Sequence, residues 1–456
     1  MNRARRTALL LILCSTALSV LWGSFVARHS SGGMTDFKAV FYASRCLVAH
    51  TDPYQYNDLL HAYLADGSKI PTDPMMADLF RRSVFVCVNV PTSLFLLIPF
   101  AWLPFVPAYV LWAALMAIGI NLSAFLMWDL ASGKAPRLAL LLVCFLAANG
   151  VILFADGNAA CIVISLCVIA VWCFLQDKFV PAGVLCLALS LAIKPHDAGL
   201  VWLYFLLAGG LFRKRALQTL AVTAAICLPA VLYASYAVPH WLPELRSNIQ
   251  LASLPGGLND PGPASIGFHN PDPIISLQSF VSVLCDDPRI YVPFSYLLSA
   301  ALLLPWMFAT FRSRVSKHQA WLGLAAISAM SMLVTYHRQH DAKLLLLTIP
   351  ACALLWEEQR LLGWIAMLLE AAVFFVTADI PATVISMVSR HVAPGVDMLD
   401  HVKAALAVRP EPLLLFVTAA FYVRIYLARC GQEQEAVDRG SPKVVWSPKL
   451  EAANNS

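Results

Sequence analysis

The sequence predicts an all-α polytopic membrane protein with about 12 transmembrane helices and large loops on one face. Of its 456 residues, 59% are hydrophobic and only 13% are charged, whereas a soluble domain is about 45–50% apolar and about 25% charged. This much apolar side chain does not fit inside one soluble core, which excludes a soluble enzyme, a disordered chain, a coiled coil and a nucleic-acid-binding domain. A spanning helix takes about 20 residues, so a dozen spans use about half the chain.

The first apolar run, 7–26, follows three arginines within the first six residues. A basic start before an apolar run is also the pattern of a cleaved signal peptide. The run is longer than most signal-peptide cores and many more runs follow it. An uncleaved first helix with its N-terminus in the cytoplasm is therefore favoured.

The later apolar runs are separated by unequal polar segments. We expect one integral-membrane domain over 1–429, with outer loops at 27–82, 239–290 and 379–410, and a polar, disordered cytoplasmic tail over 430–456. The runs lie at 83–101, 106–128, 138–154, 158–176, 181–193, 197–211, 216–238, 291–311, 319–336, 342–357, 361–378 and 411–428.

Basic residues in short loops orient these runs, because cytoplasmic loops carry an excess of lysine and arginine. The basic helix ends at 212–215, 312–317, 360 and 424–429 agree in placing the three long polar segments together on the outer face, with 337–341 beside them. Between the outer loop that ends at 82 and the cytoplasmic residue 213, the chain must therefore cross the membrane an odd number of times. Six apolar runs lie in this stretch, so one of them does not cross. Run 83–101 is expected to be re-entrant or interfacial; the alternative is that 138–154 or 181–193 fails to cross.

Asp36 is the main candidate for chemistry. It comes about ten residues after the first predicted helix and precedes Tyr42, and Tyr54 follows in the same loop. A carboxylate can take the proton from an attacking hydroxyl, and aromatic rings pack on sugar faces. The alternative is that Asp36 caps a short interfacial helix.

Two short polar breaks fall on the same predicted outer face. Lys194 lies between two apolar runs and either meets an anion such as a phosphate or extends its ammonium to the interface as an ordinary helix-end lysine. Asn158, in the sequence Asp156-Gly157-Asn158, either contributes to a binding site or belongs to a simple turn.

The densest polar cluster beside a membrane run is 336–343. Arg338 is suited to clamping a phosphate, and His337, His340 and Asp341 to binding a phosphate or a sugar hydroxyl. A solvated loop is the alternative. Metal ligation by two histidines three residues apart is disfavoured, because such sites usually bring more ligands. The cysteines lie mostly inside apolar runs without metal-ligand spacing, so we expect no cofactor and no metal.

Together these residues resemble glycosyltransferase family 87 of the GT-C superfamily. The resemblance covers roughly 26–357. It is carried by Asp36 with Phe41-Tyr42 and Asp52-Pro53-Tyr54, by Asn89-Val90-Pro91, by Gly157-Asn158, by Ala182-Gly183 to Lys194-Pro195, and by Tyr336-His337-Arg338 with His340-Asp341. The chain departs from the family at Gly157-Asn158-Ala159-Ala160, where the family often has Gly-Gln-x-Asn, and at Val90, where it often has a first proline.

The resemblance implies a GT-C fold and an inverting mannosyltransferase-like enzyme in a bacterial inner membrane, with its site on the periplasmic face. The donor would be a polyprenyl-phosphate sugar, the acceptor a lipid or glycan, and Asp36 the general base, with membrane lipids as surroundings and no nucleic acid as partner. The alternatives are a lipid or polysaccharide transporter or flippase, and a non-catalytic scaffold. Transporters tend to show paired halves, and this sequence shows no internal repeat.

Overall fold

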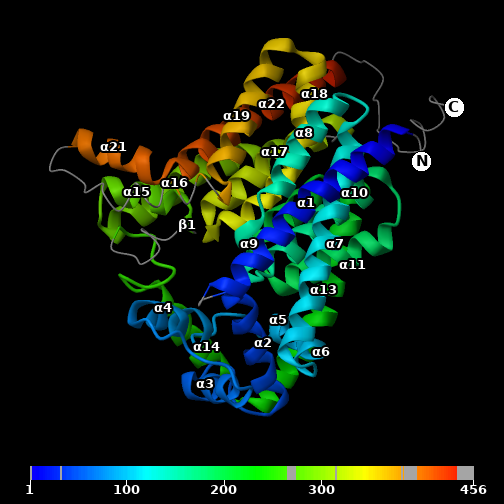
Figure 1. The fold of residues 1–456 in the computed structure, drawn as a ribbon. Coiled ribbons are helices and arrows are strands. Elements are labelled where there is room, and N and C mark those ends of the chain that lie inside the picture. Colours follow the sequence, from blue (N-terminus) through cyan, green and yellow to red (C-terminus); the bar gives the residue numbers. More distant parts are fainter. Residues whose placement is uncertain are drawn as a thin grey trace.

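A computed structural model of the chain describes residues 3–30, 33–263, 274–313, 316–379 and 398–438, together with residues 381 and 384. Helices dominate it, and the long ones run side by side in a bundle (Figure 1). Within the described residues, six helical segments are long and apolar enough to cross a membrane, which makes this an all-α polytopic membrane protein. They are α1 (Arg3–His29), α7 (Phe105–Ala131), α8 (Pro136–Ala148) with α9 (Val151–Asp156), α13 (Gly210–Ala237), α16 (Pro288–Arg312) and the first part of α22 (Pro410–Asp438).

Several of the predicted runs fold as shorter helices, so the count of about 12 spans stays a prediction. The shorter apolar helix α10 has 17 residues and reaches only about 25 Å at 1.5 Å per residue. The other helices of the bundle are α11 (Val180–Ile193), α12 (Pro195–Leu207), α17 (Lys317–Val334), α18 (Ile349–Glu358) and α19 (Arg360–Val376), beside α10 (Ala160–Gln176).

The polar segments after α1 and α13 form helices of their own. α2 (Thr35–Val48), α3 (Tyr56–Ala65), α4 (Pro74–Val84) and α14 (Trp241–Ser253) gather at one end of the bundle (Figure 1). α15 (Leu277–Leu284) packs with α21 (Met398–Val408) beside the bundle. The predicted outer loops are therefore folded, as far as the structure describes them; 264–273, 380, 382–383 and 385–397 lie outside the described residues.

Three basic residues near helix ends pair with acids from distant parts of the sequence. Arg5 contacts Asp129 at 2.7 Å, Lys134 contacts Glu357 at 2.8 Å, and Arg429 contacts Glu358 at 2.6 Å. These pairs hold the ends of separate helices together.

The run 83–101 does not form a long helix. Its apolar residues fold as the short helices α5 (Pro91–Leu96) and α6 (Ile98–Ala101). The Thr92 hydroxyl donates to the Ala192 carbonyl at 2.6 Å, and the Ser93 hydroxyl donates to the Ile193 carbonyl at 3.3 Å. The run therefore packs against the end of α11, which agrees with the expectation that it is re-entrant or interfacial.

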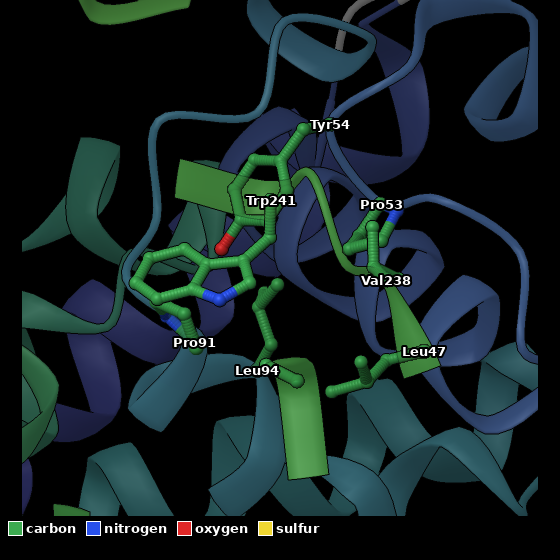
Figure 2. A pocket seen from close by; sticks show the side chains of 8 residues that line it. Leu47, Pro53, Tyr54, Pro91, Leu94, Val238 and Trp241 are labelled. Atoms are coloured by element: carbon green, nitrogen blue, oxygen red, sulfur yellow. The ribbon is translucent and has the colours of Figure 1, made fainter. Parts of the chain in front are cut away.

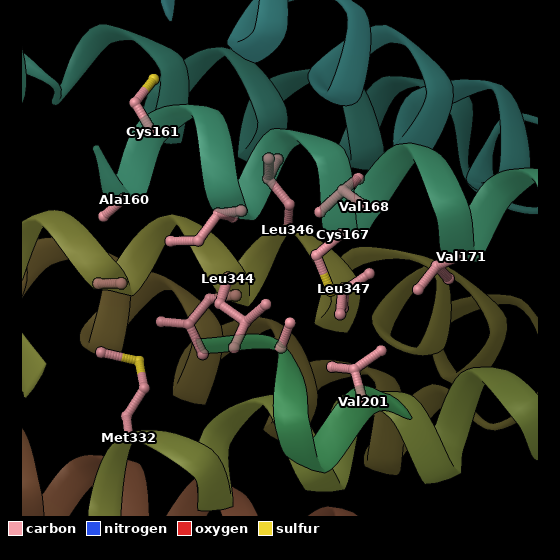
Figure 3. Packing of buried hydrophobic residues seen from close by; sticks show 14 of the residues in the cluster. Ala160, Cys161, Cys167, Val168, Val171, Val201, Met332, Leu344, Leu346 and Leu347 are labelled. Atoms are coloured by element: carbon pink, nitrogen blue, oxygen red, sulfur yellow. The ribbon is translucent and has the colours of Figure 1, made fainter. Parts of the chain in front are cut away.

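One buried segment departs from α-helical geometry. The 3₁₀ helix η2 (Gln339–Thr348) is buried at all ten of its residues. Its leucines pack against α10, α12 and α17 (Figure 3). It follows the two-residue strand β2 (His337–Arg338), which pairs antiparallel with β1 (Ile274–Ile275), Ile274 opposite Arg338. The β1 strand, in the predicted loop 239–290, thus holds the start of η2.

The predicted tail is helical at its start, because α22 continues to Asp438. Residues 439–456 lie outside the described part of the chain.

Candidate active site

Asp36 lies in the first turn of α2, just after the chain leaves α1. Met34, with a left-handed φ of 63°, makes the turn between them, and its amide donates to the Ala155 carbonyl at 2.8 Å. Asp36 therefore follows the cap position, and its Oδ2 accepts a hydrogen bond from Asn158 Nδ2 at 2.6 Å. The capping interpretation is thus not what the structure has: the carboxylate faces the break between α9 and α10.

The backbone conformation of the break between α9 and α10 orients the Asn158 side chain. Gly157 adopts φ 67°, and a Cβ there would lie 2.8 Å from the Phe37 Cβ, so the position requires glycine. The Gly157 carbonyl accepts from the Trp112 indole at 2.8 Å. The Asn158 Oδ1 accepts from the Ala160 amide at 2.8 Å, which turns its Nδ2 toward Asp36. The segment is both a turn and a partner of the candidate base.

Lys194 forms the centre of a second, buried cluster. It is the junction residue between α11 and α12, where Pro195 begins the next helix. Its Nζ lies 2.9 Å from Asp341 Oδ1 and 3.3 Å from Asp197 Oδ2, and both carboxylate side chains are 1% exposed. Lys194 is therefore not an ordinary helix-end lysine, and its charge is already balanced by two acids.

The 336–343 segment supplies the other side of this cluster. His337, Arg338, His340 and Asp341 are all buried, so the solvated-loop interpretation is wrong. Asp341 Oδ2 accepts from the Arg338 amide at 2.8 Å, and His340 Nε2 lies 3.6 Å from Asp341 Oδ1. These contacts fix the carboxylate that meets Lys194.

The Arg338 guanidinium contacts Leu258 and Tyr336. It donates to the Leu258 carbonyl at 3.0 Å and to the Tyr336 hydroxyl, and it lies over the Tyr336 ring. Arg409, between α21 and α22, is fully buried nearby. Burial lowers the pKa of Arg409 to about 10; Glu411 opposes this, and the positive charge of Arg338 lowers it further. Arg338 and Arg409 are thus close enough for their charges to interact.

Tyr42 and Tyr54, the two tyrosines selected from the sequence, make hydroxyl contacts with neighbouring segments of the chain. The Tyr42 hydroxyl contacts Asp66 at 3.1 Å and Ser68 at 3.2 Å. The Tyr54 hydroxyl donates to the Asn89 carbonyl at 3.0 Å. The Tyr54 ring also lies beside Trp241 and several aliphatic residues (Figure 2). These contacts make Tyr42 and Tyr54 parts of the loop scaffold.

Sequence reasoning did not select His196, Asp197 or Arg409. Asp197 Oδ1 lies 3.5 Å from His196 Nε2 and 3.3 Å from His337 Nε2, and these three residues are the group within the described chain that is arranged to hold a metal ion. The sequence feature that points to His196 and Asp197 is the segment Lys194-Pro195-His196-Asp197. It places three ionisable side chains within four residues, between two apolar runs.

Asn158 directly precedes the start of α10, and α10 packs along η2, the helix that contains Asp341 (Figure 3). A base held by an amide, a buried ion cluster and two arginines are a suitable set for moving a proton and stabilising an anion. Comparisons with known protein families, with curated proteins and with solved structures found no match to this chain.

Proposed function

We propose that the protein is an inverting membrane glycosyltransferase of the GT-C type. It moves a hexose, mannose by the resemblance to glycosyltransferase family 87, from a polyprenyl phosphate to a lipid or glycan acceptor on the outer face of a bacterial inner membrane. The observation that carries the proposal is the contact of Asp36 with Asn158, which holds a carboxylate at the start of the first outer helix directly after a membrane span.

In the proposed reaction Asp36 takes the proton of the acceptor hydroxyl as that oxygen attacks the anomeric carbon. The bond from this carbon to the donor phosphate breaks, and the phosphate leaves on its lipid with the electron pair. A hydrogen bond from Asn158 at 2.6 Å orients the base. Asp36 is needed only to accept one proton, so a single carboxylate suffices.

Positive charge near the leaving phosphate speeds its departure. Arg338, with Arg409 close enough for their charges to interact, suits this role. The Lys194 ammonium group lies between two buried carboxylates. The proposal therefore gives Lys194 a positioning role, holding Asp341 and the start of η2.

The test is the Asp36→Asn variant in proteoliposomes with a radiolabelled polyprenyl-phosphate mannose. Asparagine has almost the same size and still hydrogen bonds to Asn158, but it does not accept the proton. We expect turnover to fall about 10²–10⁴-fold. The control is Asp78→Asn, whose carboxylate is exposed and pairs with Arg82 at 2.9 Å in the same outer loop; it retains activity.

Full activity of Asp36→Asn contradicts the assignment of the base. Recovery of the labelled donor intact but on the opposite leaflet contradicts the transferase itself and favours a flippase. The two readouts are separated by extracting the lipids and measuring whether the label has left the polyprenyl phosphate.

A further inference from the structure

We propose that His196, Asp197 and His337 bind a divalent cation of the zinc class. The group joins residues 140 positions apart, two at the start of α12 and one in β2. His337 and Asp197 have side chains only 1% exposed, and His196 lies at the rim with 33%. The site is distinct from the Asp36 base and does not depend on the transferase proposal.

The distances fit ligands of one ion better than hydrogen bonds. Two ligand atoms at about 2.1 Å from a tetrahedral zinc lie about 3.4 Å apart. Asp197 Oδ1 is 3.3 Å from His337 Nε2 and 3.5 Å from His196 Nε2, and all three ligand atoms lie within 4.8 Å of one another. Among the residues that the structure describes, none of these three atoms has a hydrogen-bond partner, although all are buried.

One His337 tautomer suits a metal ligand. Its Nδ1 lies 3.2 Å from the Thr335 carbonyl oxygen and 3.3 Å from the Thr335 hydroxyl; when that nitrogen carries the proton, it donates to the carbonyl oxygen. In the neutral ring, Nε2 then carries a lone pair, and this lone pair faces the carboxylate oxygen of Asp197. Two acceptors facing each other in a buried site repel unless a cation lies between them. Metal-binding histidines commonly donate their second nitrogen to a backbone carbonyl in this way.

Lys194 leaves the metal-facing oxygen of Asp197 available. Its Nζ contacts the other oxygen, Oδ2, at 3.3 Å and is closer to Asp341, at 2.9 Å. The two carboxylates carry one more negative charge than this lysine balances. Two imidazoles and one carboxylate suit zinc, whereas Mg²⁺ prefers an all-oxygen shell. Three protein ligands leave a fourth position open, as in catalytic zinc sites.

The experiment measures bound metal on the purified full chain in detergent, with any affinity tag removed. The protein is stripped with a chelator, dialysed against Zn²⁺ or Mg²⁺, and its metal content is measured by mass spectrometry; Co²⁺ absorption reports the ligand geometry. We expect one Zn²⁺ per chain and no retained Mg²⁺. His337→Ala and Asp197→Asn should weaken Zn²⁺ binding at least about tenfold, since even residues supporting a ligand contribute about 10–100-fold.

The control is His240→Ala, which removes an exposed histidine at the start of α14 and should leave binding unchanged. If the buried variants fail to fold, His196→Gln at the rim provides the same test in a position that tolerates change. A wild-type chain that retains no stoichiometric Zn²⁺ overturns the proposal, because a proton then occupies the gap. Unchanged Zn²⁺ binding in a folded His337 or His196 variant overturns it as well.

Discussion

Lys194 holds two buried carboxylates, and its replacement should destabilise the fold. The substitution Lys194→Met keeps the length of the side chain and removes its charge. Asp341 and Asp197, at 2.9 and 3.3 Å from Nζ and each 1% exposed, are left as buried acids without their cation. Breaking one buried pair costs about 3–5 kcal/mol. Because one lysine serves two acids here, we expect a loss in the upper part of that range.

The assay is the free energy of unfolding of the purified protein in detergent, from a denaturant titration. A double-mutant cycle with Asp341→Asn isolates the pair: the double variant should be more stable than the sum of the two single losses predicts, by about 0.5–3 kcal/mol. The matched control is Lys403→Met. That lysine pairs with Asp400 at 3.3 Å, but both side chains are exposed, at 65% and 46%, so its loss should stay below about 1 kcal/mol.

Equal stability of Lys194→Met and Lys403→Met would refute the reasoning. It would mean that Asp197 and Asp341 are protonated or hydrated in the native protein, and that the ion cluster does not hold η2 against α11.

Three further predictions concern Gly157, Asn158 and Asp52. Gly157→Val adds a Cβ 2.8 Å from that of Phe37 at a φ of 67°; we expect about 1–3 kcal/mol of destabilisation in the same titration, and wild-type stability would contradict the tight contact. Asn158→Ala should lower transfer activity about tenfold while the protein still folds, because the candidate base loses an oriented, charge-assisted hydrogen bond; unchanged turnover would separate this amide from catalysis. Burial, and then Glu244, raise the pKa of Asp52 to about 7, so the stability that Asp52 contributes is greatest below the unfolded pKa near 4 and is lost as pH rises from about 4 to about 7. Asp52→Asn should flatten that loss between about pH 4 and 7, and an unchanged slope would assign it to another group.

The charge pattern drew attention to helix ends that the structure brings together. Arg5, Lys134 and Arg429 pair with acids from distant parts of the sequence. Run 83–101, which parity disfavoured as a crossing, folds as two short helices. The number of spans did not follow, because hydropathy does not distinguish a crossing helix from one as short as α12, with 13 residues.

The sequence singled out polar residues of the candidate site one segment at a time, without showing which of them lie together. Asp36 and Asn158 were both chosen, but 122 residues separate them, and only the fold shows that they touch. Asp197 was passed over because it reads as the first-turn acid of an apolar helix, a position that carboxylates often occupy to interact with the helix dipole. Its neighbourhood with His337 arises from the packing of α12 near β2, which no local pattern encodes.

The 3₁₀ geometry of η2 gives this segment a repeat of three. Side chains three apart are eclipsed in such a helix, so Asp341, Leu344 and Leu347 form one column and His340, Lys343 and Leu346 another. Deleting one of the four consecutive leucines leaves the hydropathy of the segment almost unchanged. It nevertheless turns everything on one side of the deletion by about 120° and shifts it by about 2 Å. Tolerance to substitution and tolerance to length change are therefore separate properties here, and a natural variant of this protein should keep the spacing of η2 more strictly than its residues.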